Sequence, residues 1–266
     1  MVAILSNTDL IKINIAGITV GVCCNDPYLQ KQMQSHYAAF LTDSQTLMNL
    51  SIMVTGHDHL LNTDLKILSG IVCFGSPGIK GSIDCENKSG YLYLNLDQPF
   101  EAIDYCLRVI YSIVAYRVGG ILLHAAGIVK NGYTYLFIGH SGSGKTTVAQ
   151  VSKPALVLND DLVLLLKREN VWLVFGTPFW NPTQVEPNPG FAPLGGIYFL
   201  VKDKEVFLEV PGQGQALAEI ISNIPVISTD PEFAAGLIQR GSELTKEIKS
   251  FRLHFLPDSS FWNLII

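Results

Sequence analysis

One stretch decides the fold of this chain and occupies positions 139–147: Gly139-His140-Ser141-Gly142-Ser143-Gly144-Lys145-Thr146-Thr147. It fits the pattern G-x-x-x-x-G-K-[ST], whose glycines allow the backbone to approach a phosphate group closely. The flanking sequence predicts a buried strand over residues 133–138 and a helix that opens at Thr146. A glycine loop between a strand and a helix directs backbone N–H groups at phosphate oxygens. The stretch therefore predicts an α/β protein that binds a nucleotide, and a plain Gly/Ser-rich turn is the alternative interpretation.

The motif also assigns individual contacts to a bound ATP. Lys145 is expected to reach the β- and γ-phosphates, and the Thr146 hydroxyl is expected to bind Mg²⁺. The predicted nucleotide contacts extend over the whole stretch, from Gly139 to Thr147. His140 stands at a freely variable position of the motif, where it is either exposed to solvent or in contact with a phosphate.

Two adjacent acids follow an apolar run downstream of this stretch. Residues 155–158 read Ala-Leu-Val-Leu, and Asp160 and Asp161 come directly after Asn159. We expect this run to form a strand beside the strand that enters the loop, with its carboxyl end facing the same crevice. Two carboxylates next to a triphosphate are unfavourable unless a cation lies between them, so the pair implies Mg²⁺. A solvated turn between two strands is the alternative.

Composition narrows the class of protein. Hydrophobic residues make up 48% of the 266 residues and charged residues 15%, against about 25% charged residues in typical soluble domains. A charge-poor surface favours self-association, so we expect a homo-oligomer. The net charge is −5, and no run of Lys or Arg appears, which argues against a nucleic-acid partner.

Two further observations concern the location of the chain. No apolar stretch reaches the length of about twenty residues that a membrane span needs, so no membrane partner is expected. The five cysteines include no C-x-x-C pair. This pattern argues against a disulfide framework or a zinc site and favours a reducing, cytoplasmic compartment.

Turn residues and apolar periodicity divide the chain into two predicted parts. Residues 1–96 form an N-terminal α+β portion, and residues 97–266 form the P-loop domain, which begins with a long helix over 97–116. The other expected elements are two strands within 11–23, strands at 50–54, 65–74, 90–96, 121–126, 196–201, 206–210 and 251–255, helices at 26–41, 216–221 and 229–249, a turn at Asn131-Gly132, a hairpin over 162–175, and a loop over 178–193.

These motifs, taken together, resemble the kinase domain of HPr kinase/phosphorylase, which belongs to a wider group with a phosphoenolpyruvate-carboxykinase-like P-loop core. That family has a His-small pair on a strand, a short hairpin, the P-loop, a short helix, and an apolar strand ending in Asp-Asp. The matching residues here are His124-Ala125, Asn131-Gly132, Gly139 to Thr146, and Leu156 to Asp161. The match is specific over about forty residues and weaker to the C-terminus, where it includes residues 192–197. It implies an α/β fold with a mixed sheet of the HPr-kinase type.

The resemblance also implies roles for individual residues. The first aspartate, Asp160, would act as the base on the acceptor hydroxyl, and His124 would orient or assist it. By itself, His124 is more typical of a core histidine. Thr146 and Asp161 would hold Mg²⁺, and Lys145 would neutralise the charge of the transferred phosphoryl group.

The chain departs from the family's pattern at three points. The family's E-[IV]-R-G-x-G motif is replaced by Gly176-Thr177-Pro178-Phe179-Trp180, in which either aromatic ring could stack on a base or pack in the core. Thr146-Thr147 stands where the family has Ser-Glu, and the N-terminal part does not resemble the usual regulatory domain. The chain therefore resembles divergent relatives encoded with peptide-modification systems.

The function that these residues favour is ATP-dependent phosphorylation of a serine or threonine hydroxyl on a peptide or small protein. A kinase for a small hydroxylated metabolite is one alternative. An ATP-binding regulator without phosphotransfer is the other, because the E-x-R-G segment is missing.

Overall fold

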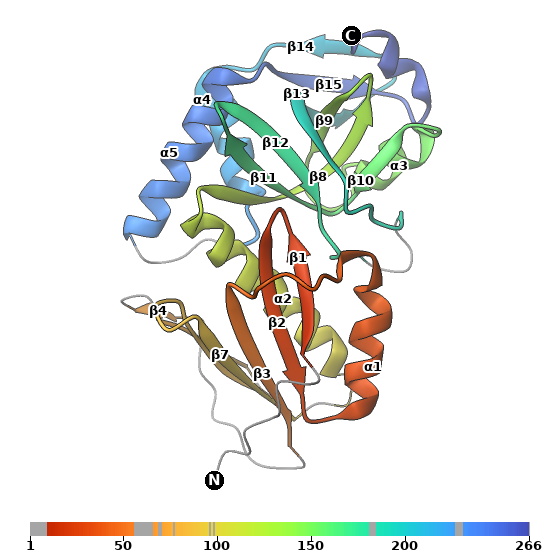
Figure 1. Ribbon diagram of the computed structural model, residues 1–266. Coiled ribbons are helices and arrows are strands. Elements are labelled where there is room, and N and C mark those ends of the chain that lie inside the picture. Colours follow the sequence, from red (N-terminus) through yellow and green to blue (C-terminus); the bar gives the residue numbers. More distant parts are fainter. Residues whose placement is uncertain are drawn as a thin grey trace. The chain divides into compact units, whose positions relative to one another are not determined.

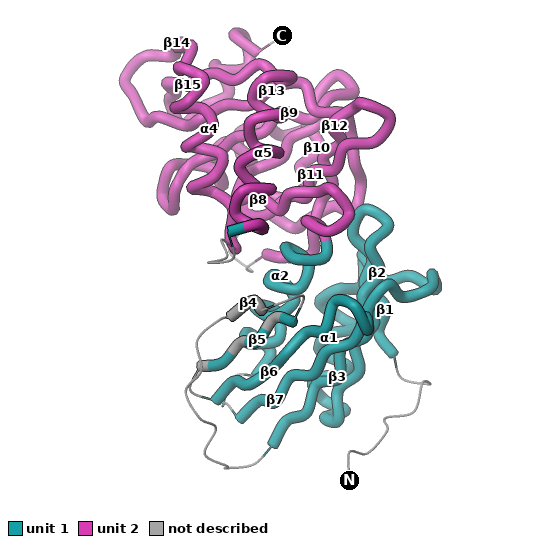
Figure 2. The backbone as a smooth tube through the Cα atoms, turned by 90° about the vertical axis from the view of Figure 1, so that its left-hand side faces the viewer, with its two compact units in different colours: residues 1–114, 228–231 teal, residues 115–227, 232–266 magenta. Residues whose placement is uncertain are grey.

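The computed structural model describes residues 10–55, 66–68, 71–76, 78–95, 97, 99–180, 185–226 and 231–265. Within these residues the chain forms five α-helices and two mixed sheets (Figure 1), which confirms the predicted mixed α/β class. It divides into two compact units (Figure 2). Unit 1 comprises residues 1–114 with 228–231, and unit 2 comprises residues 115–227 with 232–266.

Unit 1 is built on a seven-stranded sheet in the order β1-β2-β3-β7-β6-β5-β4. The predicted pair of strands within 11–23 is confirmed as an antiparallel hairpin. Strand β6 was not predicted, because its side chains alternate between polar residues and residues as small as Gly81, so that Ile83 is its one fully buried large side chain. The strands are β1 Ile11–Ile15, β2 Ile18–Cys24, β3 Met48–Val54, β4 Lys66–Leu68, β5 Ile71–Ser76, β6 Ile79–Asp84 and β7 Ser89–Leu94.

Two helices belong to this part of the chain. Helix α1, Pro27–His36, begins where expected, because the Asp26 carboxylate accepts the N–H groups of Tyr28 and Leu29. It ends at His36 rather than near residue 41, and a short 3₁₀ turn follows.

Helix α2, Pro99–Arg117, begins just after residue 97, where the boundary between the two parts of the chain was predicted. The compact units divide inside this helix, after Val114, and not ahead of it. One reason is that the Tyr111 hydroxyl donates to the Ile13 carbonyl at 2.7 Å and the Tyr37 hydroxyl donates to Asp104 at 2.9 Å. These bonds fasten the helix to β1 and to the end of α1. The domain assignment itself stays a prediction.

Unit 2 contains an eight-stranded sheet. Its main path runs β10-β8-β11-β12-β13-β15-β14, and β9 lies off this path between β8 and β13. The strands are β8 Gly120–Lys130, β9 Tyr133–Ile138, β10 Leu156–Asn159, β11 Leu162–Arg168, β12 Val171–Gly176, β13 Phe191–Lys202, β14 Phe207–Glu209 and β15 Ser250–Phe255. The helices are α3 Lys145–Val151, α4 Gln213–Ser222 and α5 Pro231–Glu247.

Strand β9 is the centre of unit 2. It follows the Asn131-Gly132 turn, whose two residues have φ of 53° and 81° as a tight hairpin turn requires. Its side chains enter two apolar clusters on opposite faces: Leu136 and Ile138 pack with α4 and α5, whereas Phe137 packs with α3. Figure 1 shows α3 on one side of these strands and α4 with α5 on the other.

The prediction that the Asp-Asp strand lies beside β9 is wrong. Strand β10 pairs with β8, because the two edges of β9 are already paired, one with β8 and the other with β13. Since β8 is antiparallel to both β9 and β10, these two strands run in the same direction. Their carboxyl ends therefore meet at the same edge of the sheet, as the sequence analysis expected.

The remaining differences are small. Strand β13 begins at Phe191, inside the predicted loop 178–193, because residues 191–193 pair with β12. The predicted start of the last helix, at residue 229, lies outside the described residues, as does part of the predicted loop. The predicted hairpin over 162–175 is confirmed as β11 and β12.

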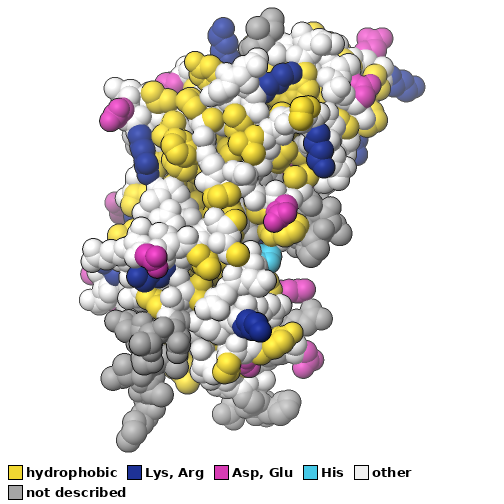
Figure 3. Space-filling view, turned by 45° about the vertical axis from the view of Figure 1, so that its right-hand side comes forward, with side chains coloured by type: hydrophobic (Ala, Val, Ile, Leu, Met, Phe, Trp, Pro, Cys, Tyr) yellow, Lys and Arg dark blue, Asp and Glu magenta, His cyan; other side chains and the backbone are white. Residues whose placement is uncertain are grey.

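The surface drawn in Figure 3 carries few charged side chains, in keeping with the low proportion of charged residues in the sequence. On the face drawn in Figure 3, charged side chains of the described residues mostly lie apart from one another, among hydrophobic and uncharged groups. None of the helices in the described ranges is long and apolar enough to cross a membrane. Self-association stays a prediction.

We expect Leu136→Ala to lower the free energy of unfolding by about 2–5 kcal/mol, because it leaves a cavity at the centre of β9. Leu136 is fully buried, whereas Leu156 is 45% exposed, so Leu156→Ala serves as the matched control. Urea denaturation of both variants measures the difference. Equal losses in the two variants would contradict a core centred on β9.

Candidate functional site

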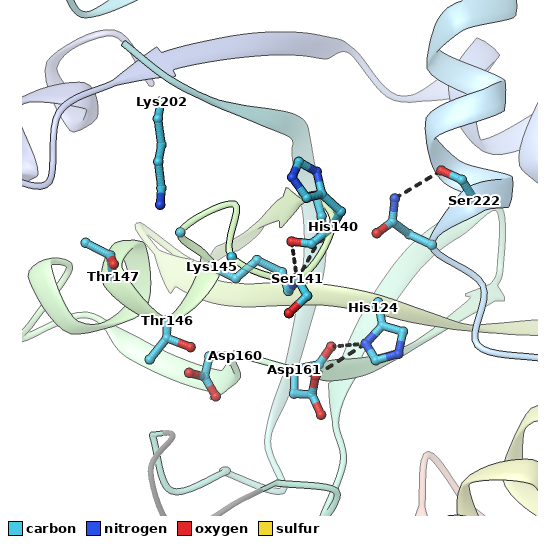
Figure 4. A pocket seen from close by; sticks show the side chains of 14 residues that line it. His124, His140, Ser141, Lys145, Thr146, Thr147, Asp160, Asp161, Lys202 and Ser222 are labelled. Atoms are coloured by element: carbon cyan, nitrogen blue, oxygen red, sulfur yellow. Dashed lines mark hydrogen bonds and ion pairs between the residues drawn. The ribbon is translucent and has the colours of Figure 1, made fainter. Parts of the chain in front are cut away.

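A cavity of about 610 Å³ lies where the carboxyl ends of β9 and β10 meet. Eight of the nine predicted nucleotide contacts line it, together with the predicted residues on β8 and after β10 (Figure 4). Its lining consists of His124, Gly139, His140, Ser141, Gly142, Gly144, Lys145, Thr146, Thr147, Asp160, Asp161, Lys202, Ser222 and Asn223. The structure thus brings the predicted residues together, and their roles stay predictions. Ser143 is the exception, because its side chain is buried away from this cavity.

The loop of residues 139–144, here called the glycine loop, contains glycines that are required for different reasons. Gly144 has φ of 110°, in the left-handed region, and a Cβ there would lie 2.7 Å from the ring of Phe255. Gly139 has no such φ, but its Cβ would lie 2.6 Å from the Ser143 hydroxyl. The loop is therefore shaped by close packing as well as by backbone freedom.

Lys145 folds back over the glycine loop. Its ammonium donates to the Gly139 carbonyl at 2.7 Å and to the His140 carbonyl at 3.4 Å (Figure 4). Burial lowers the pKa of Lys145 below its ordinary value, and the negative charges of Asp161 and Asp160 oppose this shift. The cation thus lies inside the loop and within the field of both aspartates.

Asp160 is the most unusual side chain of the cavity. It is 1% exposed, and neither carboxylate oxygen has a hydrogen-bond partner among the described residues. Burial raises the pKa of this carboxyl above its ordinary value. The Thr146 hydroxyl and the Val185 backbone lie near enough to oppose the shift, without reaching hydrogen-bond geometry. Figure 4 shows the Thr146 hydroxyl beside the Asp160 carboxylate.

Asp161 has a different environment, because its carboxylate faces His124. The distance from His124 Nδ1 to Asp161 Oδ1 is 3.3 Å, and the side chains are 39% and 16% exposed. The backbone fixes both residues: the His124 N–H donates to the Asn223 carbonyl at 2.8 Å, and the Ala125 N–H donates to the Asp161 carbonyl at 3.0 Å. The pair is therefore both ordered and accessible from the cavity.

Asn159 positions the two aspartates, although it was not among the residues predicted for the site. Its Oδ1 accepts the N–H groups of Asp161 at 2.6 Å and Leu162 at 3.0 Å. Its Nδ2 donates to the carbonyls of Thr177 at 2.8 Å and Phe179 at 3.1 Å. The side chain is fully buried, and three of the four bonds are buried while the bond from the Asp161 N–H is partly buried. The one sequence signal is a polar residue at the end of an apolar strand.

Three further residues of the lining were not predicted. Lys202 ends β13, and Figure 4 shows its ammonium directed toward the glycine loop. Ser222 and Asn223 stand at the end of α4. Phe179 and Trp180 do not line the cavity, and Phe179 is fully buried, so stacking of either ring on a ligand in this cavity is not supported.

The donor set of the cavity fits a magnesium ion held partly by a ligand. The described residues contain no group of three His, Cys, Asp or Glu side chains that would form a complete protein cage. Mg²⁺ is usually bound through one or two carboxylates and by the phosphates of a substrate. The two unpartnered oxygens of Asp160, beside the Thr146 hydroxyl, match this chemistry.

We expect Asn159→Ala to lower the free energy of unfolding by about 2–4 kcal/mol, because it leaves two buried N–H groups and two carbonyls without their partner. Chemical denaturation measures the loss. Asn263→Ala, at an exposed asparagine, is the matched control. A loss no larger than that of the control would contradict the positioning role.

Asp160→Asn should stabilise the unliganded protein at neutral pH by about 1–3 kcal/mol, because it removes a buried charge without a partner. The raised pKa gives the sign of the pH dependence: the wild type loses stability as the pH rises above 3.8, the ordinary value, through the raised value. The gain should therefore shrink toward pH 4. Thermal melts across this range measure it. Asp161→Asn, which removes the interaction with His124, should give no gain, and a gain equal to that of Asp160→Asn would refute the distinction.

Comparison with known proteins finds similar solved structures but no matching family or curated sequence. The solved structure described as the Hpr(Ser) kinase/phosphatase from Coxiella burnetii is similar to 54% of this chain over 89% of its own length, at 12% sequence identity and a TM-score of 0.29. A likeness at this TM-score does not establish a shared fold.

Proposed function

We propose that this chain is an ATP-dependent phosphotransferase of the P-loop type that phosphorylates a serine or threonine hydroxyl on a peptide or small protein. The observation that carries the proposal is the combination within one cavity of the glycine loop, the Lys145 ammonium and the buried, unpartnered carboxylate of Asp160. A buried carboxylate without a hydrogen-bond partner lowers the stability of the folded protein. Its retention in this cavity therefore favours a functional role over a purely structural one.

The glycine loop supports binding of a triphosphate. Lys145 now donates to two loop carbonyls, and phosphate oxygens would replace them as stronger, charged acceptors. Helix geometry leaves the first N–H groups of α3 without intrahelical acceptors, and no side chain of the described residues caps this helix. These amides are therefore free to face the phosphates.

Thr146 and Asp160 are the residues that would hold Mg²⁺. When bound, this ion offsets charge on the β- and γ-phosphates. Asp160 is suited to this role because both of its carboxylate oxygens lack protein partners and lie beside the Thr146 hydroxyl. Its burial also makes it a poor partner for an acceptor hydroxyl that arrives from solvent.

Asp161 and His124 are suited to binding the hydroxyl group that accepts the phosphoryl group. Their side chains face each other at 3.3 Å and remain partly exposed. Asp161 would orient the acceptor hydroxyl and receive its proton late in a loose phosphoryl transfer, while His124 holds the carboxylate in place. This proposal exchanges the roles that the sequence analysis gave to Asp160 and Asp161, on the grounds of burial and partners.

The nature of the acceptor rests on the motif resemblance alone. The family that the segment 124–161 resembles acts on a serine of a protein, and shortened relatives act on peptides. The experiment must therefore separate peptide phosphorylation from two other outcomes. These are phosphorylation of a small hydroxylated metabolite and ATP binding without transfer.

The test combines nucleotide binding with transfer. Wild-type protein should bind ATP more tightly with Mg²⁺ than without it, and should transfer ³²P from [γ-³²P]ATP to members of a Ser/Thr peptide array. Lys145→Ala should abolish binding. Asp160→Asn should lose the effect of Mg²⁺ on affinity, whereas Asp161→Asn should keep that effect and reduce transfer by at least about a hundredfold.

Each contradictory outcome has its own meaning. Failure of the wild type to bind ATP with Mg²⁺ would refute a nucleotide site. Loss of the Mg²⁺ effect in Asp161→Asn, with its retention in Asp160→Asn, would restore the roles given by the sequence. Labelling of a small hydroxylated compound instead of any peptide would change the acceptor class, and binding without any transfer would support a regulator.

A further inference from the structure

A second cavity of about 500 Å³ adjoins the first one at the glycine loop. The two cavities share Lys202 and three loop residues, Gly139, His140 and Gly142. The walls that belong to the second cavity alone carry charge: they include Glu209 on β14, Glu219 on α4, and Arg252 and His254 on β15. None of these side chains was singled out by the sequence.

Sheet topology gives the second cavity its place relative to a bound triphosphate. Strands β9, β13 and β15 are parallel neighbours, so their carboxyl ends lie at one edge, where ligands bind in α/β sheets. The Asp160 strand, β10, lies on the other side of β9, beyond β8. A triphosphate with its γ-phosphate near Asp160 and its other phosphates on the shared loop residues would place its α-phosphate on the side of β13 and β15.

The acidic side chains of this cavity are loosely held. Arg252 Nη1 lies 3.9 Å from Glu209 Oε2, and Arg252 Nη2 lies 4.0 Å from Glu219 Oε1. These separations exceed those of hydrogen bonds, which are near 2.9 Å. The two carboxylates are 55% and 39% exposed. The guanidinium thus lies near both carboxylates without a hydrogen bond to either, and their oxygens can accept other donors.

His254 has a buried ring nitrogen without a hydrogen-bond partner in the described part of the chain, which is a second and independent indication of a ligand in this cavity. Its Nδ1 lies 2.8 Å from the Asp203 carboxylate, and its ring stacks on Phe207 at 4.0 Å between centroids. Its Nε2 is buried, and no group among the described residues makes a hydrogen bond to it, since Glu209 lies 3.7 Å away. A fixed ring with an unpartnered buried nitrogen is suited to a polar ligand.

We propose that this second cavity binds the nucleoside of the nucleotide, with the ribose hydroxyls donating to the carboxylates of Glu209 and Glu219. The inference rests on the proposed function and adds to it the residues that would select a ribonucleotide over a deoxyribonucleotide. A carboxylate that accepts a ribose hydroxyl is a known solution at the carboxyl edge of α/β sheets. Lys202, which borders both cavities, would lie near the α-phosphate.

The experiment separates the triphosphate from the nucleoside. Dissociation constants are measured with Mg²⁺ for inorganic tripolyphosphate, for ATP and GTP, and for the 2′-deoxy and 3′-deoxy analogues of each. The better of the two nucleotides should bind at least about tenfold more tightly than tripolyphosphate, and about tenfold more tightly than at least one of its deoxy analogues, which is the size expected for one hydrogen bond to a charged group.

Variants of the two glutamates test whether the preference for ribose over deoxyribose arises in the second cavity. The double variant Glu209→Ala/Glu219→Ala should bind the ribonucleotide and its deoxy analogues within about twofold of each other. Its affinity for tripolyphosphate should not fall. Glu169→Ala, at an exposed hairpin residue outside the cavity, is the matched control and should keep the wild-type ratio. Melting temperatures of all variants verify that they are folded.

The outcomes distinguish the two proposals. If the wild type binds neither tripolyphosphate nor a nucleotide, the proposed function fails. If tripolyphosphate binds as tightly as every nucleotide, or if the double variant keeps the wild-type preference for ribose, the nucleoside cavity alone is refuted.

Discussion

The constraint on which unit 2 depends is the pairing of strand β9 along both of its edges. Strand β8 occupies one edge as the partner of a tight hairpin, and β13 occupies the other as a parallel neighbour. This arrangement moves β10 to the outer edge of β8, so the aspartates reach the carboxyl end of β9 from one side only. The opposite side is left to β13 and β15, which carry Lys202, Arg252 and His254 of the second cavity.

Electrostatics then separates two neighbouring aspartates that the sequence presents as a pair. Asn159 fixes the short segment between β10 and β11 through four hydrogen bonds, and in this segment one carboxylate is directed inward and the other toward His124. The inward carboxylate has no partner and a raised pKa because of burial, whereas its neighbour faces an imidazole and remains accessible. Sites that keep such unfavourable groups commonly do so for function, at a cost in stability.

The glycine loop shows how packing and function share the same residues. Gly144 is required by its positive φ and by the ring of Phe255, while Gly139 is required by the buried Ser143 hydroxyl. The loop is therefore held from the side of α3 and β15 as well as from its own turn. Lys145 closes it by donating to two of its carbonyls, which keeps the cation inside the loop.

The sequence alone determined the strand, loop and helix around residues 133–151, the Asn131-Gly132 hairpin and the mixed α/β class, because glycine spacing, turn residues and apolar periodicity act locally. It also named eleven of the fourteen residues that line the first cavity. Only the tertiary structure decided that β10 pairs with β8, that Asn159 is fully bonded, and that Arg252 and His254 adjoin the loop. These features depend on which strand edges are free and on contacts between residues far apart in the chain, and no local pattern encodes either.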